Sequence, residues 1–377
     1  MTTFAPLFVP GPLRVAVADE AWLEAMLDAE RALATALARL AVIPEGGAAA
    51  VVGKCDPGLF DIQQIAAQGR TVANPAEPLV RALREQVGEA SSRYVHYGAT
   101  SQDIVDTAAM LLARRAVAVI VEELAGLERE CAGLAAAHRS TPMAARTLLQ
   151  QAVPTTFGYK AASWLAAVRD ARGALDRLEF PAQLGGAAGT LAVYGERGPE
   201  VLAAFAAELR LLDPVLPWHT NRAPIARLAS TLAAAARAAG KIGADVVLLA
   251  QTEVAEVAEA EPGGSSAMPH KRNPVRAVLA KACYRSANGY LTVLLDGEYE
   301  HERAAGAWQA EWDAVSGALA FTGGAVAAAR ECLAGLKVDA GRMRSNMTED
   351  LSSDGAPNLG SAETFVDRVL AGEREAG

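Results

Sequence analysis

Aromatic residues, cysteines and histidines are scarce in this sequence. Phe, Trp and Tyr make up 5% of the 377 residues although hydrophobic residues make up 51%, so most of the apolar surface comes from Ala, Leu and Val. This composition is typical of closely packed helices and favours an all-α fold. The four cysteines lie far apart without metal-ligand spacing, at Cys55, Cys131, Cys283 and Cys332. They indicate free or buried thiols in a reducing compartment, and we expect a cytoplasmic protein without a bound metal.

Basic clusters and long uncharged apolar runs are also missing. Lys and Arg total 35 against 44 Asp and Glu, which gives a formal net charge of -9, and the basic residues are scattered. A nucleic-acid surface needs clustered positive charge, so we expect no nucleic-acid partner. Charges such as Arg237, Lys241 and Asp245 interrupt the longest apolar runs, which argues against a membrane span. Asp19 and Glu20 follow a short apolar start that does not resemble a signal peptide.

Apolar residues recur every three or four positions through most of the chain, which predicts helices. The expected helices cover 21–40, 103–138, 154–178, 199–211, 224–259, 274–295 and 303–336. Several of them exceed thirty residues, or on the order of 50 Å. Their apolar surface is too extensive for one chain to cover, so we expect an elongated bundle packed against other subunits. The segment "TLAVYGE" near Leu191 fits a short strand.

The pattern divides the chain into three parts. Gly, Pro and Asn punctuate the beginning, which predicts a loop-rich helical N-terminal domain at 1–102. A central bundle of long helices follows at 103–340. The remaining segment, 341–377, contains Gly, Ser and Pro in its first half and is expected to be loop-like there.

Polar residues gather at three breaks between the predicted helices. In "RYVHYGATSQDIVDT" (93–107), Gly98 permits a turn, and Thr100, Ser101 and Asp103 begin a helix whose free N–H groups can bind an anion. Ordinary capping by Thr100 or Ser101 explains the same residues. In "ARTLLQQAVPTTFG" (145–158), polar side chains lie one helical turn apart, an arrangement better explained, on its own, as a capped helix end. These side chains are Arg146, Thr147 and Gln150.

The third break, "GGSSAMPHKRNP" (263–274), is richer in charge than a connector needs. Two glycines and two serines precede a His-Lys-Arg-Asn cluster that has a proline on each side. In a chain of net negative charge, such a cluster predicts a loop that meets an anionic group.

This loop resembles the signature G-S-S-x-M-P-x-K-x-N-P of the fumarase/aspartase superfamily. The matching positions are Gly264, Ser265, Ser266, Met268, Pro269, Lys271, Asn273 and Pro274. "HYGATSQD" and "RTLLQQAVP" resemble two further shared regions, and the correspondence runs from the first helix to about Met347. Within the superfamily, "QLGGAAGTLA", "PWHTNR" and "EHERAAGAWQAEW" are most similar to the 3-carboxy-cis,cis-muconate cycloisomerase family of the protocatechuate branch of the β-ketoadipate pathway. Adenylosuccinate lyase is the next most similar.

The resemblance implies an all-α homotetramer whose active sites each combine segments of three subunits. It implies β-elimination beside a carboxylate, or the reverse addition, on a small tricarboxylate without a metal or other cofactor. Ser265 is then the base on a mobile loop, and Lys271 and the loop amides favour its alkoxide. Lys271 and Asn273 are expected to hold one substrate carboxylate. The other residues expected to contact substrate are His96, Thr100, Ser101, Thr147, Gln150 and Arg303.

Two departures from the superfamily pattern bear on the substrate. Lyases that release a nitrogen generally have a histidine after the Arg-Thr of the second region, where this chain has Leu148. A basic nitrogen gains from a general acid when it leaves, whereas a carboxylate, with a pKa of about 4, leaves unaided. Leu148 therefore favours lactone chemistry, unless another histidine has taken over. The C-terminal segment is shorter than the helical domain that covers the site in relatives, which puts full closure in question.

Several alternatives stay open at this point. An adenylosuccinate lyase-like activity and a non-catalytic helical scaffold are the competing interpretations, although a scaffold would not need a glycine-rich cationic loop. Arg303 is either a substrate contact or part of a surface ion-pair cluster with His301 and Glu302. His138 is expected to cap a helix C-terminus. His219 and His270 have no assigned role.

Overall fold

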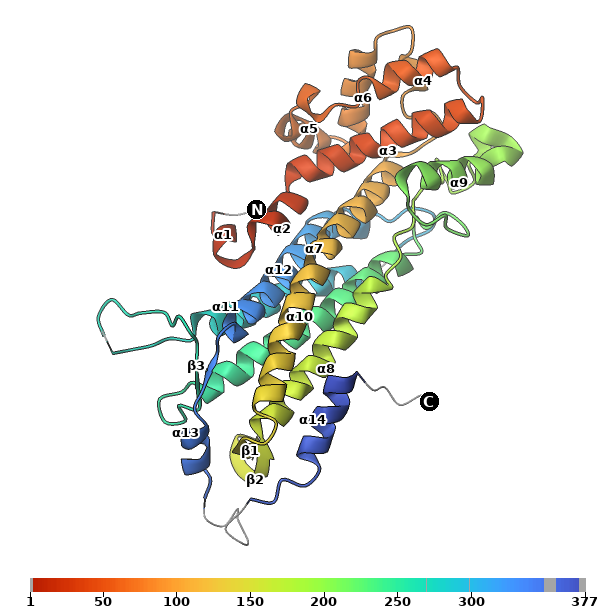
Figure 1. Cartoon of the computed structure of the whole chain (residues 1–377). Helices are drawn as coiled ribbons and strands as arrows, with labels where there is room; N and C mark the ends of the chain where they lie inside the picture. Colours follow the sequence, from red (N-terminus) through yellow and green to blue (C-terminus); the bar gives the residue numbers. More distant parts are fainter. Residues whose placement is uncertain (1–2, 269, 298, 349–356, 373–377) are drawn as a thin grey trace.

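The computed structural model describes residues 3–268, 270–297, 299–348 and 357–372. It shows an elongated bundle of long helices with a smaller helical lobe at one end (Figure 1). The described strands form two small two-stranded sheets. The prediction of an all-α fold with a central bundle is therefore confirmed. No helix among the described residues is both long and apolar enough to cross a bilayer.

Short helices and one long helix form the N-terminal lobe. The long helix, α3, runs from Asp19 to Arg39 and buries one apolar side. It contacts the central helix α7 and also α9 (Figure 1). The other helices of this part are α1 (Ala5–Phe8), α2 (Gly11–Ala16), α4 (Glu45–Val52), α5 (Ile62–Gly69) and α6 (Ala76–Val87), with single 3₁₀ turns at Pro57–Leu59 and Ser92–Tyr94.

Five helices build the central bundle and pack on one another through small side chains. They are α7 (Ser101–Ala137), α8 (Phe157–Asp176), α10 (Ala223–Leu249), α11 (Val275–Leu295) and α12 (Ala307–Leu333). A Cβ at Gly243 of α10 would lie 2.7 Å from the carbonyl oxygen of Ala277, so α10 and α11 approach each other closely because this position is glycine. Buried alanines line the same contacts, which explains the composition.

Helix α7 is the longest of the described helices, with 37 residues, and begins as the sequence predicts. Thr100 is its N-cap, and the Asp103 side chain accepts a hydrogen bond from the Thr100 N–H in a capping box. The expected C-terminal cap at His138 is confirmed. The expectation that several helices exceed thirty residues is wrong for the described residues, since α10 and α12 have 27 residues each.

Helix α10 ends at Leu249, ten residues before the predicted end. No glycine or proline stops it, but Ala255 has a φ of 48°, and the buried Glu256 pairs with Arg146 at 2.6 Å. Tertiary contacts therefore override a favourable helix propensity. A short sheet of β3 (Val257–Ala258) and β4 (Lys337–Val338) follows.

The start of α12 is delayed to Ala307 because Gly306, with a φ of 123°, interrupts the helix.

Residues 142–156 form a hairpin, so the prediction of a helix end at Arg146–Gln150 is wrong. Strand β1 (Pro142–Thr147) pairs antiparallel with β2 (Gln150–Thr156), and Thr147 faces Gln150. Leu148 and Leu149 make the two-residue turn with φ of 49° and 64°. Positive φ at both turn positions matches the right-handed twist of a hairpin. Likewise "TLAVYGE" is not a strand, since 192–197 form a 3₁₀ turn ahead of α9 (Gly198–Leu209).

The C-terminal segment adds two short helices to the bundle. Helix α13 (Ala340–Ser345) lies beside the hairpin, and α14 (Ala362–Ala371) packs on α8. An ion pair of 2.6 Å between Arg139 and Asp367 holds α14 near the end of α7. Positions 349–356, part of the stretch predicted to be loop-like, lie outside the described residues.

Candidate active site

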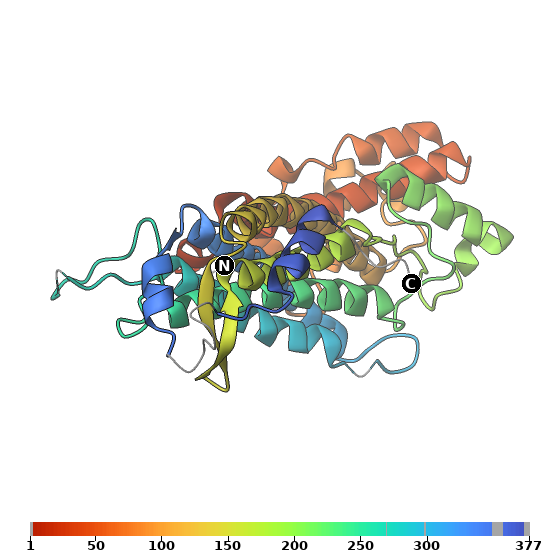
Figure 2. The same cartoon turned by 60° about the horizontal axis from the view of Figure 1, so that its bottom comes forward.

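The three polar segments lie at three separate places on the chain. The start of α7 lies beside the N-terminal lobe, the hairpin lies at the opposite end of the bundle, and the signature loop projects from its side (Figures 1 and 2). The structure thus brings His96, Thr100, Ser101 and Arg303 to one place. It leaves Thr147 and Gln150 at a second place and Ser265, Lys271 and Asn273 at a third. In a single chain these groups do not meet.

Arg303 lies over the N-terminus of α7. Its Nη1 donates to the Thr100 hydroxyl at 2.9 Å, and its Nη2 donates to the Ala187 carbonyl at 2.9 Å. A guanidinium beside a helix N-terminus is an arrangement suited to an anionic group. Among the described residues, Arg303 has no carboxylate partner, so the alternative of a surface ion-pair cluster with Glu302 is not what the structure shows.

His96 is fixed just before α7 by a carboxylate from the N-terminal lobe. Its Nδ1 lies 2.5 Å from Glu30 Oε1, and its backbone N–H donates to Glu30 Oε2 at 3.1 Å. His96 has a φ of 60°, an uncommon conformation for a residue with a Cβ, and the double contact with Glu30 holds it there. Burial alone lowers the pKa of His96, but the Glu30 and Asp103 carboxylates outweigh it and raise the pKa. The ring is therefore held toward its cationic form.

Asp103 joins the start of α7 to two other segments. Its buried carboxylate accepts hydrogen bonds of 2.9 Å from the N–H groups of Gly185 and Gly186, and His219 Nε2 lies 2.7 Å from Oδ1. Gln102 donates to the carbonyl of His219 at 2.8 Å. His219, which had no assigned role, thus belongs to the support of this site.

A buried ionic network lies one turn further along α7. Arg222 is buried between Asp106, at 2.7 Å, and Glu311 of α12, and its guanidinium lies over the ring of Trp218. Burial lowers the pKa of Arg222, but these two carboxylates raise it more, so it remains charged. Removing Arg222 would leave the two buried carboxylates, Asp106 and Glu311, without their cation. The network fixes the helices that carry the α7 site.

The signature loop is closed at its base by a backbone bridge. The N–H groups of Gly263 and Asn273 each donate to the other residue's carbonyl at 2.9 Å. Within the loop, Ser265 Oγ accepts from the N–H groups of Ala267, at 3.4 Å, and Met268, at 3.2 Å. Donors directed at this oxygen are the type of contact that favours an alkoxide.

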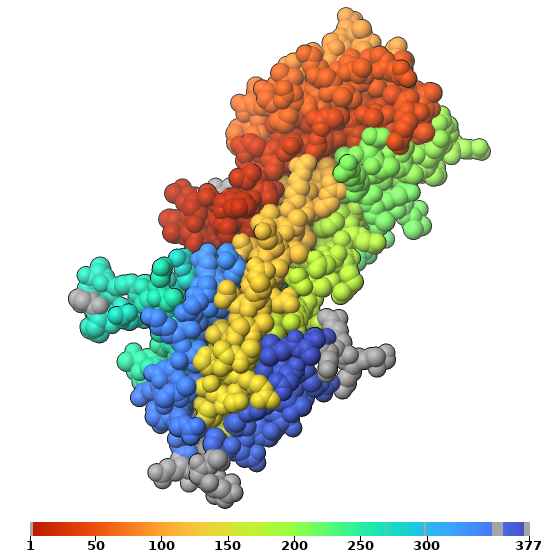
Figure 3. Space-filling view, in the orientation of Figure 1, coloured from red at the N-terminus to blue at the C-terminus, as the bar shows by residue number. Residues whose placement is uncertain are grey.

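Most described residues in the rest of the loop are exposed to solvent. Figure 3 shows it, in teal, projecting from the side of the bundle. Lys271 and His270 are exposed, and Asn273 Nδ2 donates to the Gly264 carbonyl at 3.3 Å. Pro269 of the signature lies outside the described residues.

The hairpin exposes its turn to solvent. Leu148 is 96% exposed, and Thr147 and Gln150 are exposed beside it. Arg146 instead pairs with the buried Glu256, so it fixes the hairpin to the bundle. Among the described residues, no group of three or more His, Cys, Asp and Glu side chains is arranged to hold a metal ion.

Sequence reasoning missed Glu30 as a partner of this site. It lies in the apolar stripe of α3, four residues after Met26 and three before Leu33, and is only 1% exposed. A charged residue at such a position needs a partner, because an unpaired buried charge is costly. A glutamate within an apolar stripe therefore predicts a buried partner, but the sequence does not show that this partner is His96.

Comparison with known proteins agrees with these features. A family model described as "Lyase" matches residues 12–286. The chain belongs to this lyase family, within the fumarase/aspartase superfamily. Nitrosuccinate lyase of Streptomyces davaonensis is a superfamily relative 46% identical over 91% of this chain and 76% of its own length. A 3-carboxy-cis,cis-muconate cycloisomerase of Bradyrhizobium diazoefficiens is 44% identical over 91% of this chain and 78% of its own length.

A solved structure of the superfamily extends the likeness to the fold. The crystal structure of 3-carboxy-cis,cis-muconate lactonizing enzyme from Pseudomonas putida matches with a TM-score of 0.91 and 33% identity, and the match covers 98% of both chains. The superfamily assignment made from the three motifs is confirmed, and the chain is an enzyme of the cycloisomerase-like group within it.

Proposed function

We propose that the protein converts 3-carboxy-cis,cis-muconate to 4-carboxymuconolactone. The observation that carries the proposal is the likeness to proteins of that name over nine-tenths of the chain, together with a match of the whole fold to a lactonizing enzyme. The intact Ser265, Lys271 and Asn273 of the signature loop support catalysis over a scaffold role.

The proposed reaction is an intramolecular addition. One carboxylate oxygen of the substrate attacks the conjugated double bond, the C–O bond of the lactone forms, and the electron pair moves to the carbon beside a second carboxylate. Ser265 delivers a proton to that carbon. Lys271 and Asn273 hold this second carboxylate and stabilise the negative charge that develops on it. His96, Thr100, Ser101 and Arg303 hold another carboxylate at the start of α7.

Leu148 is consistent with a weakly basic leaving group in the reverse reaction, the opening of the lactone. An apolar side chain at the hairpin turn cannot protonate a nitrogen. Opening of a lactone releases a carboxylate, which needs no acid. Adenylosuccinate cleavage, which expels a basic nitrogen, is disfavoured for the same reason.

The active form is proposed to be a cytoplasmic homotetramer in which sites form between subunits. Support comes from the separation of the three groups on one chain, because a substrate of this size cannot reach all of them. Large apolar side chains on α11 are also exposed in the isolated chain, including Val278 at 50% and Leu295 at 52%. Apolar surface of this kind is typical of helices that pack against other subunits.

Nitrosuccinate cleavage is the second candidate function. The 46% identity to nitrosuccinate lyase favours it. Nitrite is also a weak base and would leave without an acid, so Leu148 does not distinguish the two reactions.

A substrate comparison on one purified preparation decides between them. The enzyme should turn over 3-carboxy-cis,cis-muconate with a kcat/KM at least about tenfold above those for nitrosuccinate, adenylosuccinate, argininosuccinate and fumarate, which corresponds to about 1.4 kcal/mol of transition-state preference. Faster release of nitrite from nitrosuccinate would overturn the cycloisomerase proposal in favour of the second candidate.

A further inference from the structure

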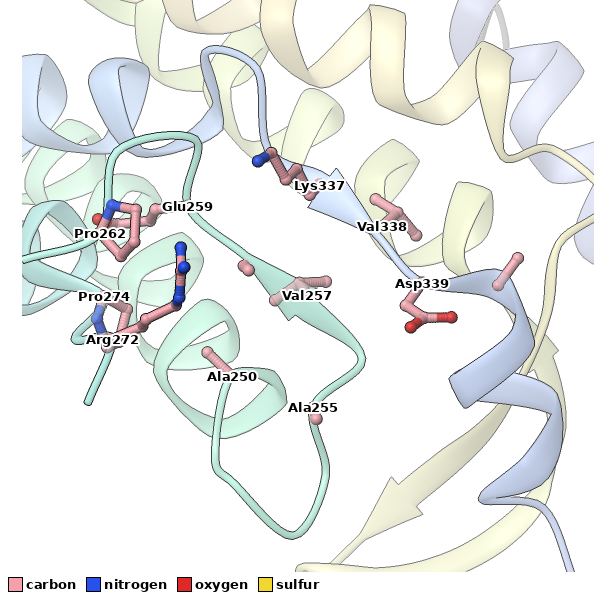
Figure 4. Close-up of a pocket in the computed structure, with 12 residues that line it drawn as sticks. Ala250, Ala255, Val257, Glu259, Pro262, Arg272, Pro274, Lys337, Val338 and Asp339 are labelled. Atoms are coloured by element: carbon pink, nitrogen blue, oxygen red, sulfur yellow. The ribbon is translucent and has the colours of Figure 1, made fainter. Parts of the chain in front are cut away.

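A cavity lies at the base of the signature loop, on the side of the bundle. Figure 4 shows it between the end of α10, the β3–β4 sheet and the chain around Pro262 and Pro274. Its volume is about 500 Å³. Part of its wall is apolar, from Ala250, Val257 and Val338. The proposed catalytic chemistry makes no use of this cavity.

Two cationic side chains line the cavity without a partner. Arg272 comes from the loop and Lys337 from β4, and neither side chain makes a hydrogen bond or ion pair with any described residue. The two carboxylates in the lining are already engaged. Glu259 accepts from the N–H groups of Arg276, at 3.2 Å, and Ala277, at 2.8 Å.

The second carboxylate, that of Asp339, accepts from the N–H of Arg342 at 2.8 Å. Both acidic side chains accept from backbone donors, and neither forms an ion pair with Arg272 or Lys337 among the described residues. A guanidinium presents a planar fork that matches phosphate or carboxylate oxygens, and an ammonium adds a point charge from another direction.

The proposed catalytic residues of the loop do not line the cavity. Its lining includes Arg272 and Pro274 but neither Lys271 nor Asn273. This alternation is expected beside the Gly263–Asn273 bridge, because successive side chains of an extended chain point in opposite directions. A ligand here would not compete directly with a substrate bound to Lys271 and Asn273.

We propose that this cavity binds a small doubly charged anion, a phosphate or a short dicarboxylate, between Arg272 and Lys337. Arg272 belongs to the loop, whereas Lys337 belongs to a strand fixed to β3 of the bundle. The bound anion therefore ties the base of the loop to the bundle and restricts its motion. The inference concerns regulation of the loop and does not depend on which substrate the enzyme uses.

Hydrogen exchange on the full-length protein tests this proposal. Inorganic phosphate and succinate are titrated separately at constant ionic strength, with sodium chloride as the non-binding salt, and exchange is followed in peptides covering 263–274. At least one of the two anions should slow exchange there in a saturable way, and the comparison shows which chemistry the cavity prefers. If neither anion gives saturable protection, the proposal is wrong.

Two variants connect the effect to the cavity. Lys337→Met should raise the dissociation constant of the protective anion by about tenfold or more, equivalent to about 1.4 kcal/mol. Arg344→Met removes a nearby exposed positive charge from α13 that does not line the cavity, and it should leave the titration unchanged. Equal protection in the Lys337→Met variant, or an equal loss in both variants, would show that the anion acts elsewhere or only through overall charge.

Discussion

Glu30 accepts two hydrogen bonds from His96, one from the ring and one from the backbone N–H, and so links α3 to the start of α7. Glu30 is buried, and the pair lies next to Asp103 and its partner His219. Two histidine–carboxylate pairs therefore lie beneath the Thr100–Arg303 contact. The proposed carboxylate-binding end of the site is built on side chains that are already fixed before substrate arrives.

Replacing Glu30 by glutamine should reduce stability in a pH-dependent way. Glu30 raises the pKa of His96, so the pair stabilises the folded protein most below the ordinary histidine pKa of 6.5, and this contribution is lost as the pH rises through the raised value. Glu30→Gln should lower the free energy of unfolding by about 1.5–3 kcal/mol at about pH 5.5, the usual contribution of a hydrogen bond to a charged group, and by less at about pH 8.5. Denaturant unfolding at both pH values measures this.

Glu24→Gln provides the control for this prediction. Glu24 is on the same helix but exposed, 3.5 Å from Arg115. Its replacement should change stability by less than about 0.5 kcal/mol at either pH, because exposed ion pairs contribute little. A Glu30→Gln variant that is destabilised equally at both pH values would mean that Glu30 acts only through packing.

Motifs in the sequence predicted the start of α7 but not the hairpin. The start of α7 was predictable because Thr100 and Asp103 form a capping box, a pattern that depends only on four adjacent residues. The hairpin was not predictable in the same way. Its turn carries Leu148 and Leu149 at positive φ, where Asn-Gly is the usual signal.

Long-range contacts account for the remaining differences. The end of α10 depends on Glu256 reaching Arg146, which is 110 residues away in sequence. The role of His219 depends on Asp103, 116 residues away. Neither contact can be predicted from local periodicity, because periodicity indicates only which face of a single helix is apolar.

Ser265→Ala should reduce turnover by about 10²-fold or more, the scale expected for loss of a proton-transfer group. The melting temperature should stay unchanged, because the only described partners of Ser265 Oγ are two N–H groups of the exposed loop. Ser266→Ala is the matched control, since the neighbouring serine makes no described side-chain hydrogen bond, and it should keep turnover within about threefold of the parent. Near-parental turnover of Ser265→Ala would remove this residue from the mechanism.

Mixing two inactive variants tests whether sites form between subunits. Ser265→Ala alters the signature loop, and Arg303→Met removes the guanidinium that contacts Thr100 at the start of α7. The signature loop and the start of α7 lie apart on one chain (Figure 1). If each site takes these segments from different subunits, mixed assemblies contain some sites with both parental residues. Co-refolded variants should then recover about a quarter of the parental kcat, as expected for random assortment of two equally abundant subunits into closed oligomers.

Light scattering on the same samples should give the mass of a tetramer. Recovery of activity requires that both variants share one oligomer, so each variant refolded alone serves as the control and should remain inactive. No recovery from a mixed sample that light scattering shows to be tetrameric would mean that each site takes both segments from the same subunit.

The proton that Ser265 is proposed to deliver leaves a trace in the product. Lactone formed in deuterated water should contain one deuterium, bound to the carbon beside the carboxylate that Lys271 and Asn273 hold. Mass spectrometry and proton NMR measure its amount and position. Lactone without carbon-bound deuterium would exclude this step.

Leu148→His tests whether the reaction needs a proton transfer at the carboxylate oxygen that forms the lactone. The new imidazole at the exposed hairpin turn would be a general acid for a basic leaving group. Lactonisation needs no proton at oxygen, since the attacking group is a carboxylate, so kcat should stay within about threefold of the parent at neutral pH. A rise in kcat of about tenfold or more would mean that a proton transfer at oxygen limits the parental enzyme, and the proposed mechanism, which has no such step, would then be wrong.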